Sequence, residues 1–383
     1  MIALSEPNLT GLEKDLVNQC LESGWISTSG SFVNEFEETI SGFCNSQFAI
    51  ACVNATSGLH ISLKLSGVER NTEVLVPTLT FAAPINAIIY NNAFPVFFDV
   101  DKYHTLNVEQ VINFLENETY EKDKEVFNTR TDRKISCILP VHTWGNVCDV
   151  PSLKDYINKR NISISIVEDA SESLGSTISH KKKDIHSGTI GDFGVISFNG
   201  NKIITSGGGG IILTNDQEKA KEAKHLISQA KKDPVRYIHD KVGFNYGLTN
   251  IHAALGLGQF KNLENFLNRK QEIHKFYIKE ISNIDGLSIL DTPDNSTSNY
   301  WLNILRIESS FKRDREEMMA HLKSKAIQTR PIWFANHLQE PYKDFQSYEI
   351  SFAVNEINKC LCIPSSTNLS DEDLSTVVTS INE

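Results

Sequence analysis

The sequence predicts an α/β fold with a seven-stranded, mostly parallel sheet and a smaller α+β region after it. Short apolar runs rich in β-branched residues recur over the first 214 residues, and helical patterns separate them. This alternation is typical of a sheet covered by helices on both faces. From residue 215 the chain becomes rich in Lys, Glu, Gln and Ala. We therefore expect a large domain over residues 1–250, and a linking helix with a small C-terminal domain over residues 251–383.

Each expected element has a local signal. A helix over 57–67 has a small polar start and a stop at Gly67, and Pro151 suits the first turn of a helix over 151–160. The lysine run 181–183 is expected at an exposed hairpin tip. The expected strands are 48–54, 73–77, 95–100, 135–141, 162–168, 193–198 and 210–214. Further helices are expected at 107–119, 250–281 and 312–325, with an apolar run at 300–307.

Composition excludes several classes of protein. The 383 residues are 40% hydrophobic and 22% charged, as in ordinary globular chains. A net charge of −11 offers no attraction to phosphate backbones, so no nucleic-acid partner is expected. No apolar run approaches the roughly 18 residues that span a bilayer, and no export signal is recognised, so a cytoplasmic protein is expected. The seven irregularly spaced cysteines predict no metal site.

Two side chains at predicted strand ends could carry chemistry. Asp169 follows the strand 162–168, which places its carboxylate at the edge where open α/β sheets bind ligands. Such a carboxylate could pair with a protonated pyridine nitrogen, or it could equally cap the next helix. Lys202 follows the strand 193–198 on a turn that precedes four glycines. A partly desolvated lysine can attack a carbonyl, although any single lysine is far more often a surface residue.

Three further turns are expected at the same edge. Residues 54–58 present hydroxyls and free N–H groups at a helix start, which suits a phosphate group, although Thr56 or Ser57 could simply be an N-cap. Phe81 could stack on a flat cofactor or pack in the core. His142 could contact a ligand or be a buried, hydrogen-bonded imidazole.

The order of these features resembles one family. Glu168-Asp169-Ala170-x-Glu172 followed by Ser197-Phe198-x-x-x-Lys202 and a glycine run is similar to the DegT/DnrJ/EryC1/StrS sugar aminotransferases. The resemblance extends from Gly30-Ser31-Phe32 to Cys362-Ile363-Pro364 and includes Val242-Gly243-Phe244-Asn245-Tyr246. It implies the aspartate-aminotransferase-like fold (fold type I) and pyridoxal 5′-phosphate as cofactor. It also implies transfer of an amino group from L-glutamate to a nucleotide-linked keto sugar.

The resemblance assigns roles to individual residues. Lys202 would hold the cofactor and shuttle the proton, Asp169 would keep the pyridine nitrogen protonated, and Phe81 would stack on the ring. Asn245 would reach the cofactor phosphate of a neighbouring subunit, which implies a homodimer with shared sites. The remaining implied cofactor contacts are Ala55, Thr56 and Ser197 at the phosphate and Glu172 near the ring hydroxyl.

The resemblance also suggests a substrate. The glycines at 207–210 and Asn199-Gly200-Asn201-Lys202 most resemble the branch acting at C4 of UDP-linked 2-acetamido-4-keto-6-deoxy sugars for surface glycans. Amination at C3, or a dTDP or GDP carrier, is the alternative. Gly247 stands where the family usually has arginine, which removes one anion contact. The candidate substrate contacts are His142, Tyr300, Arg330 and His337, with Trp301 as a further neighbour.

Three other functions are weighed against this one. Some relatives are dehydratases in which histidine replaces the lysine, and Lys202 argues against that chemistry. A silent, scaffolding relative is disfavoured because Lys202, Asp169 and Asn245 are all present. A nicotinamide-dependent dehydrogenase would need G-x-G-x-x-G after the first strand, where this chain has Asn54-Ala55-Thr56-Ser57-Gly58.

Overall fold

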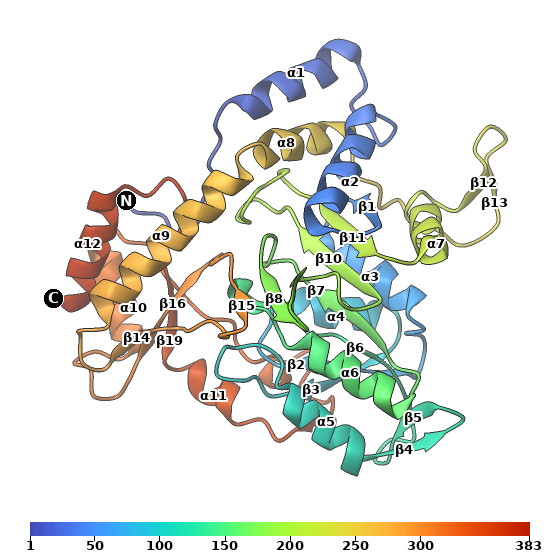
Figure 1. Ribbon diagram of the computed structural model, residues 1–383. Helices are drawn as coiled ribbons and strands as arrows, with labels where there is room; N and C mark the ends of the chain where they lie inside the picture. The colour runs from blue at the N-terminus through green and yellow to red at the C-terminus, as the bar shows by residue number, and fades with distance from the viewer.

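The computed structural model describes all residues, 1–383, and is built around one large mixed sheet (Figure 1). Its strands lie in the order β1-β11-β10-β7-β6-β2-β3-β18. All seven strands expected from the sequence are present: 73–77 and 210–214 match at both ends, and the other five differ by one to a few residues at one or both ends. Their bounds are β1 Phe48–Cys52, β2 Glu73–Pro77, β3 Phe94–Phe98, β6 Lys134–Ile138, β7 Ser165–Asp169, β10 Phe193–Ser197 and β11 Gly210–Thr214, and β18 Ser347–Tyr348 is a short addition.

The expected parallel character of the sheet is confirmed. β10, β7, β6, β2 and β3 pair in parallel with their neighbours, whereas β11 runs antiparallel to both β1 and β10. The predicted strand 162–168 begins later, at Ser165, and continues to Asp169. Parallel strands bring their carboxyl ends to one edge, so the turns after β2, β7 and β10 meet there.

Helices cover both faces of the sheet. Alternate residues such as Val74 and Val76 pack with α3, α4 and α7 on one face, whereas Leu75 packs with α5 and α6 on the other. α2 covers the β1–β11 end of that second face. The bounds are α2 Ser31–Cys44, α3 Ala55–Leu65, α4 Ala82–Tyr90, α5 Val108–Asn117, α6 Val150–Arg160 and α7 Gln217–Ile227.

The long helix expected over 250–281 is two helices. α8 spans Asn250–Phe260 and α9 spans Leu263–Ile281, with a break at Lys261 and Asn262. α1 (Leu12–Ser23) packs along α8, whereas α9 leads to a second sheet in the order β14-β16-β19-β17 (Figure 1). The elements of this region are β14 Leu287–Ile289, β16 Asn303–Ile307, α10 Arg315–Ser324, β17 Arg330–Pro331, α11 Phe352–Glu356, β19 Cys360–Ile363 and α12 Asp371–Asn382.

Short hairpins decorate the body of the molecule. The lysine run 181–183 lies at the tip of the β8–β9 hairpin, as expected. The chain start returns to the C-terminal region, where Ile2 bridges Ile327 and both termini lie beside α12 (Figure 1). None of the helices is long and apolar enough to cross a membrane. The remaining strands are β4 Thr119–Lys122, β5 Glu125–Asn128, β8 Thr177–His180, β9 Lys183–His186, β12 Lys231–Asp233, β13 Ile238–His239 and β15 Ser296–Thr297.

Candidate active site

A cavity of about 320 Å³ lies at the carboxyl ends of β2, β7 and β10. It brings together eight of the twelve residues singled out from the sequence. Asn199, Asn201, Ser171, Trp301 and Trp333 also line it. The eight are Ala55, Thr56, Phe81, Asp169, Glu172, Ser197, Lys202 and Arg330.

The start of α3 forms one end of the cavity. The first N–H groups of a helix have no partner within it, and here the Asn54 side chain accepts only from the N–H of Ser57, at 2.8 Å. Asn54 is therefore the N-cap, in place of the Thr56 or Ser57 suggested by the sequence. A Cβ at Gly210 would lie 2.6 Å from the nitrogen of Ala55, so glycine is needed for β11 to pass this close. Ala55 and Thr56 line the cavity at the positive end of α3, where the first N–H groups of the helix suit an anion.

Asp169 is the last residue of β7 and lies at the cavity wall. Its side chain is buried and accepts a 3.0 Å hydrogen bond from the N–H of Ser171. Burial raises the pKa of Asp169, while the hydrogen bonds from Ser171 and the charge of Lys202 oppose that rise. A buried carboxylate that faces a cavity without an ion-pair partner suits a cationic ligand atom.

The neighbouring carboxylate, Glu168, points to the opposite face of the sheet because strand side chains alternate. Its oxygens accept from the N–H groups of Gly188, Ile190 and Gly191 at 2.9, 2.7 and 2.6 Å. Burial alone would raise the pKa of Glu168, but His142 and the N–H groups of Gly188 and Gly191 together outweigh it and hold the pKa below its usual value. Glu168 thus fixes the loop that leads into β10.

His142 belongs to this structural network, which corrects its expected role as a substrate contact. Its Nε2 lies 2.9 Å from Glu168 Oε2, and its Nδ1 accepts from the N–H of Cys148 at 3.1 Å. Both ring nitrogens are therefore occupied, the side chain is fully buried, and the ring does not line the cavity. The second of the two alternatives, a hydrogen-bonded buried imidazole, is the one observed.

Glu168→Gln is expected to destabilise the fold by about 2–3 kcal/mol, because an NH₂ group would face backbone N–H donors and leave them unsatisfied. Urea unfolding followed by circular dichroism measures the change. Because Glu168 lies outside the cavity, the folded fraction should keep its cofactor affinity. An unchanged unfolding midpoint would contradict the assigned role.

Lys202 follows β10 on a turn closed by its N–H to the carbonyl of Asn199. Its Nζ lies 3.3 Å from Glu172 Oε1 and 3.8 Å from the centre of the Trp301 ring. Burial raises the pKa of Glu172 to about 7, although the nearby Lys202 charge opposes this. The Glu172 carboxyl group can therefore take up or release a proton near neutral pH, within hydrogen-bond distance of the Lys202 amine.

Aromatic residues cover the cavity. Phe81 is 60% exposed at the start of α4, and its ring centre lies 6.3 Å from that of Trp333. Trp301 donates from Nε1 to the carbonyl of Asn201 at 2.7 Å, and buried Lys270 donates to the Trp301 carbonyl. No role was predicted for Trp333. Its position two residues after Pro331 was the available signal, but an aromatic residue after a proline is common in cores.

Three predicted site residues besides His142 lie outside the cavity. Tyr300 stacks on His274 with 4.0 Å between ring centres, and His337 Nδ1 lies 2.7 Å from the hydroxyl of Thr78, so neither lines this cavity as a substrate contact would. Asn245 is exposed and also lies away from the cavity of its own chain. Its expected role at a neighbouring subunit stays a prediction.

The cavity residues fit pyridoxal phosphate. The start of α3 offers N–H groups for a phosphate, Asp169 offers an unpaired buried carboxylate for a protonated ring nitrogen, and Lys202 offers an amine within the same space. Phe81 presents an exposed ring at the cavity edge. These groups differ in chemistry, and one molecule with an anionic, a cationic and a carbonyl end satisfies them together.

Comparison with known proteins also points to an aminotransferase. Residues 7–382 match the model of the DegT/DnrJ/EryC1/StrS aminotransferase family. A GDP-perosamine synthase of Escherichia coli O157:H7 is 34% identical over 383 residues, covering 100% of this chain and 98% of that protein. A GDP-perosamine synthase of Caulobacter vibrioides is 31% identical over 384 residues, covering 100% and 98%.

A solved structure is similar over the whole chain. The aminotransferase TlmJ from Streptoalloteichus hindustanus superimposes with a TM-score of 0.87 at 26% identity, covering 100% of this chain and 98% of that one. The fold type expected from the resemblance is thereby confirmed. The chain belongs to the DegT/DnrJ/EryC1/StrS aminotransferase family and is a pyridoxal phosphate-dependent sugar aminotransferase.

Proposed function

We propose that the enzyme transfers the amino group of L-glutamate to C4 of a GDP-linked 4-keto-6-deoxy hexose. The observation that carries this proposal is the full-length similarity to two proteins named GDP-perosamine synthase. Perosamine is a 4-amino-4,6-dideoxy sugar, so its immediate precursor carries the keto group at C4. The UDP carrier expected from the glycine run has no support in these names, and the GDP alternative replaces it.

The cavity residues divide the work of this reaction. When bound, pyridoxal phosphate supplies a carbonyl that accepts the amino group and a ring that takes up the electrons released at the substrate carbon. Lys202 holds the cofactor, Asp169 keeps a positive charge on the ring nitrogen, and Phe81 covers one ring face. The N–H groups of Ala55 and Thr56, with the Ser197 hydroxyl, bind the phosphate.

Lys202 is also the proton carrier. Its flexible side chain could deliver a proton to sugar C4. Glu172, 3.3 Å away with a pKa near 7, can hold the proton that the Lys202 amine must lose before it acts. Trp301 and Trp333 exclude water from this exchange.

Arg330 is the remaining candidate for the nucleotide carrier. It lies exposed at the edge of the cavity in β17, where a guanidinium can pair with the diphosphate. Such a contact would offset the missing arginine at Gly247. Tyr300 and His337 do not line the cavity and would act only indirectly, through the residues that they contact.

The test compares carriers directly. The purified enzyme with pyridoxal phosphate and L-glutamate is given GDP-, UDP- and dTDP-linked 4-keto-6-deoxy sugars, and the amino sugars are quantified by mass spectrometry. We expect kcat/KM for the GDP sugar to exceed the others by at least about 100-fold, which corresponds to roughly 3 kcal/mol of differential binding. A preference for the UDP-linked 2-acetamido sugar would restore the carrier expected from the sequence.

We also propose that two subunits share each active site. The β12–β13 hairpin projects from the body of the molecule and exposes Val235, Tyr237 and Ile238, while Trp25 is 59% exposed (Figure 1). Asn245 follows this hairpin, is exposed and does not line the cavity of its own chain. A second copy of the chain would cover these apolar side chains and receive Asn245 at its cofactor phosphate.

Subunit mixing tests this sharing. Lys202→Ala and Asn245→Asp are each expected to be inactive, whereas co-expressed chains should recover about a quarter of the wild-type activity, because half of the dimers then contain one intact site. Light scattering measures the oligomeric state. Failure of the mixed protein to recover activity would show that Asn245 serves its own chain.

A further inference from the structure

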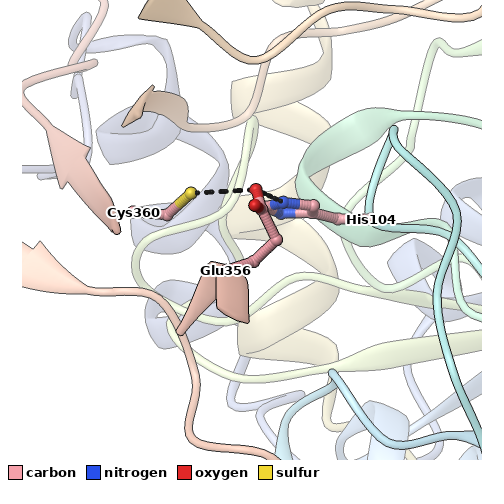
Figure 2. A group of neighbouring side chains, drawn as sticks. All are labelled: His104, Glu356 and Cys360. Carbon is pink, nitrogen blue, oxygen red and sulfur yellow. Dashed lines mark hydrogen bonds and ion pairs between the residues drawn. The ribbon is translucent and has the colours of Figure 1, made fainter. Parts of the chain in front are cut away.

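A buried cluster lies behind the active site, outside the cavity. His104 follows β3, Glu356 ends α11 and Cys360 begins β19, and the three side chains converge as Figure 2 shows. His104 Nε2 lies 3.1 Å from Glu356 Oε2, and the Cys360 thiol donates to the same oxygen at 3.3 Å. Arg306 Nη2 lies 2.8 Å from the other oxygen of Glu356.

The hydrogen bonds of His104 determine which of its two ring nitrogens carries the hydrogen. The Trp144 Nε1–H donates to His104 Nδ1 at 3.2 Å, so Nδ1 carries no hydrogen and Nε2–H must donate to Glu356. A metal ion at this cluster would have to displace that proton and sit beside the Arg306 guanidinium. The donor set therefore favours a hydrogen-bonded support over a metal site.

Trp144 connects this support to the cavity. Its backbone is left-handed, with φ of 62°, a conformation that non-glycine residues keep only where their surroundings enforce it. In this conformation its N–H donates to Glu172 Oε2 at 2.9 Å. Its indole stacks on Trp333, with 4.1 Å between ring centres and 24° between planes. Trp144 thus touches both the partner of Lys202 and the aromatic wall.

We propose that His104 and Glu356 are positioning residues for transamination: through the indole of Trp144 they hold Glu172 against Lys202 and Trp333 against the cavity. The proposal rests on the proposed roles of Lys202 and Glu172. Arg306 anchors one end, and the chain of contacts runs through Glu356, His104, Trp144 and Glu172 to the reacting amine.

The arrangement predicts a change in the pH profile when the support is lost. The Trp144 N–H is one of the groups that lower the pKa of Glu172 against its burial. If Trp144 relaxes, this donor leaves and Glu172 protonates at higher pH. The ionisable groups around Glu172 are Lys202, Asp169 and Cys362, with Arg330 on the cavity edge, and they stay in place.

Three variants separate this role from general stability. His104→Leu removes both hydrogen bonds of the ring, and His104→Gln can keep both, since its amide oxygen can accept from Trp144 while its NH₂ donates to Glu356. Cys360→Ala is the matched control, because it removes a donor from the same carboxylate without touching Trp144. Trp144→Phe, which loses the indole donor and some ring area, replaces His104→Leu if that variant does not fold; it is read by the rate and pH profile alone, because it also removes one indole of the stacked pair.

Two readouts are used. Circular dichroism of the cofactor-free protein reports the stacked Trp144–Trp333 pair, whose coupled indoles give a paired signal. The single-turnover rate with L-glutamate is measured against pH for the loaded enzyme. For His104→Leu we expect loss of the paired signal, a fall in rate of about 10- to 100-fold, and an acid limb displaced upward by about one pH unit.

The controls decide between the outcomes. His104→Gln should restore the signal and most of the rate, and Cys360→Ala should match the wild type in both. A normal dichroism signal and pH profile in His104→Leu, or equal damage in Cys360→Ala, would overturn the proposal. If the proposed role of Lys202 is wrong, Lys202→Ala will keep the covalently bound cofactor. The dichroism change in His104→Leu would still be seen in that case, so the two failures can be told apart.

Discussion

Lys202→Ala is expected to abolish covalent attachment of pyridoxal phosphate and to lower turnover by about 10⁴-fold, because the same amine binds the cofactor and carries the proton. The substitution should leave the fold intact, since the Lys202 side chain contributes one contact with Glu172 and one with the Trp301 ring. Visible absorbance of the purified protein, before and after borohydride reduction, measures the attachment.

Lys219→Ala is the matched control for that experiment. Lys219 also pairs with a carboxylate, Asp192, at 2.8 Å and lies 5.4 Å from an aromatic ring, that of Phe193. It lies outside the active-site cavity, so its loss should leave absorbance and turnover unchanged. Retention of a reducible cofactor bond in Lys202→Ala would assign the attachment to another lysine.

Asp169→Asn is expected to lower turnover by about 10³-fold while the protein stays folded. Asparagine has nearly the shape of aspartate, but a neutral amide cannot stabilise a positive charge on the ring nitrogen. Because burial already raises the pKa of Asp169, the folded protein without cofactor should lose no stability from removal of this charge.

Two measurements check the Asp169 prediction. Steady-state kinetics gives the loss of turnover, and thermal unfolding without cofactor gives the stability, which should equal or exceed that of the wild type. Near-normal turnover would remove Asp169 from the mechanism. A large loss of stability would show that its carboxylate belongs to the Glu168 network.

The central sheet was predictable because its signals are local. Each of the seven expected strands is a short apolar run, and the turn after such a run lies at the edge of the sheet. The positions of Asp169 and Lys202 followed from that rule. The phosphate end also followed from Asn54-Ala55-Thr56 before a helix, although its cap proved to be Asn54.

The errors arose where distant segments decide the outcome. Whether His142 meets a ligand depends on Glu168 and Cys148, which approach it only in the folded chain. Tyr300 begins the apolar run 300–307 expected from the sequence, but in the fold it stacks on His274 and does not line the cavity. The break between α8 and α9 lacks a proline or glycine at Lys261–Asn262, so the local pattern continued across it.

The order Glu168-Asp169 limits how this chain can change in length. Glu168 holds the loop before β10 and Asp169 lines the cavity, so two adjacent residues of β7 have different functions. A one-residue insertion or deletion inside Ser165–Asp169 would exchange the two faces, placing each carboxylate where the other belongs. Natural relatives should therefore vary in length at the loop 161–164 before β7, and keep the strand itself free of gaps.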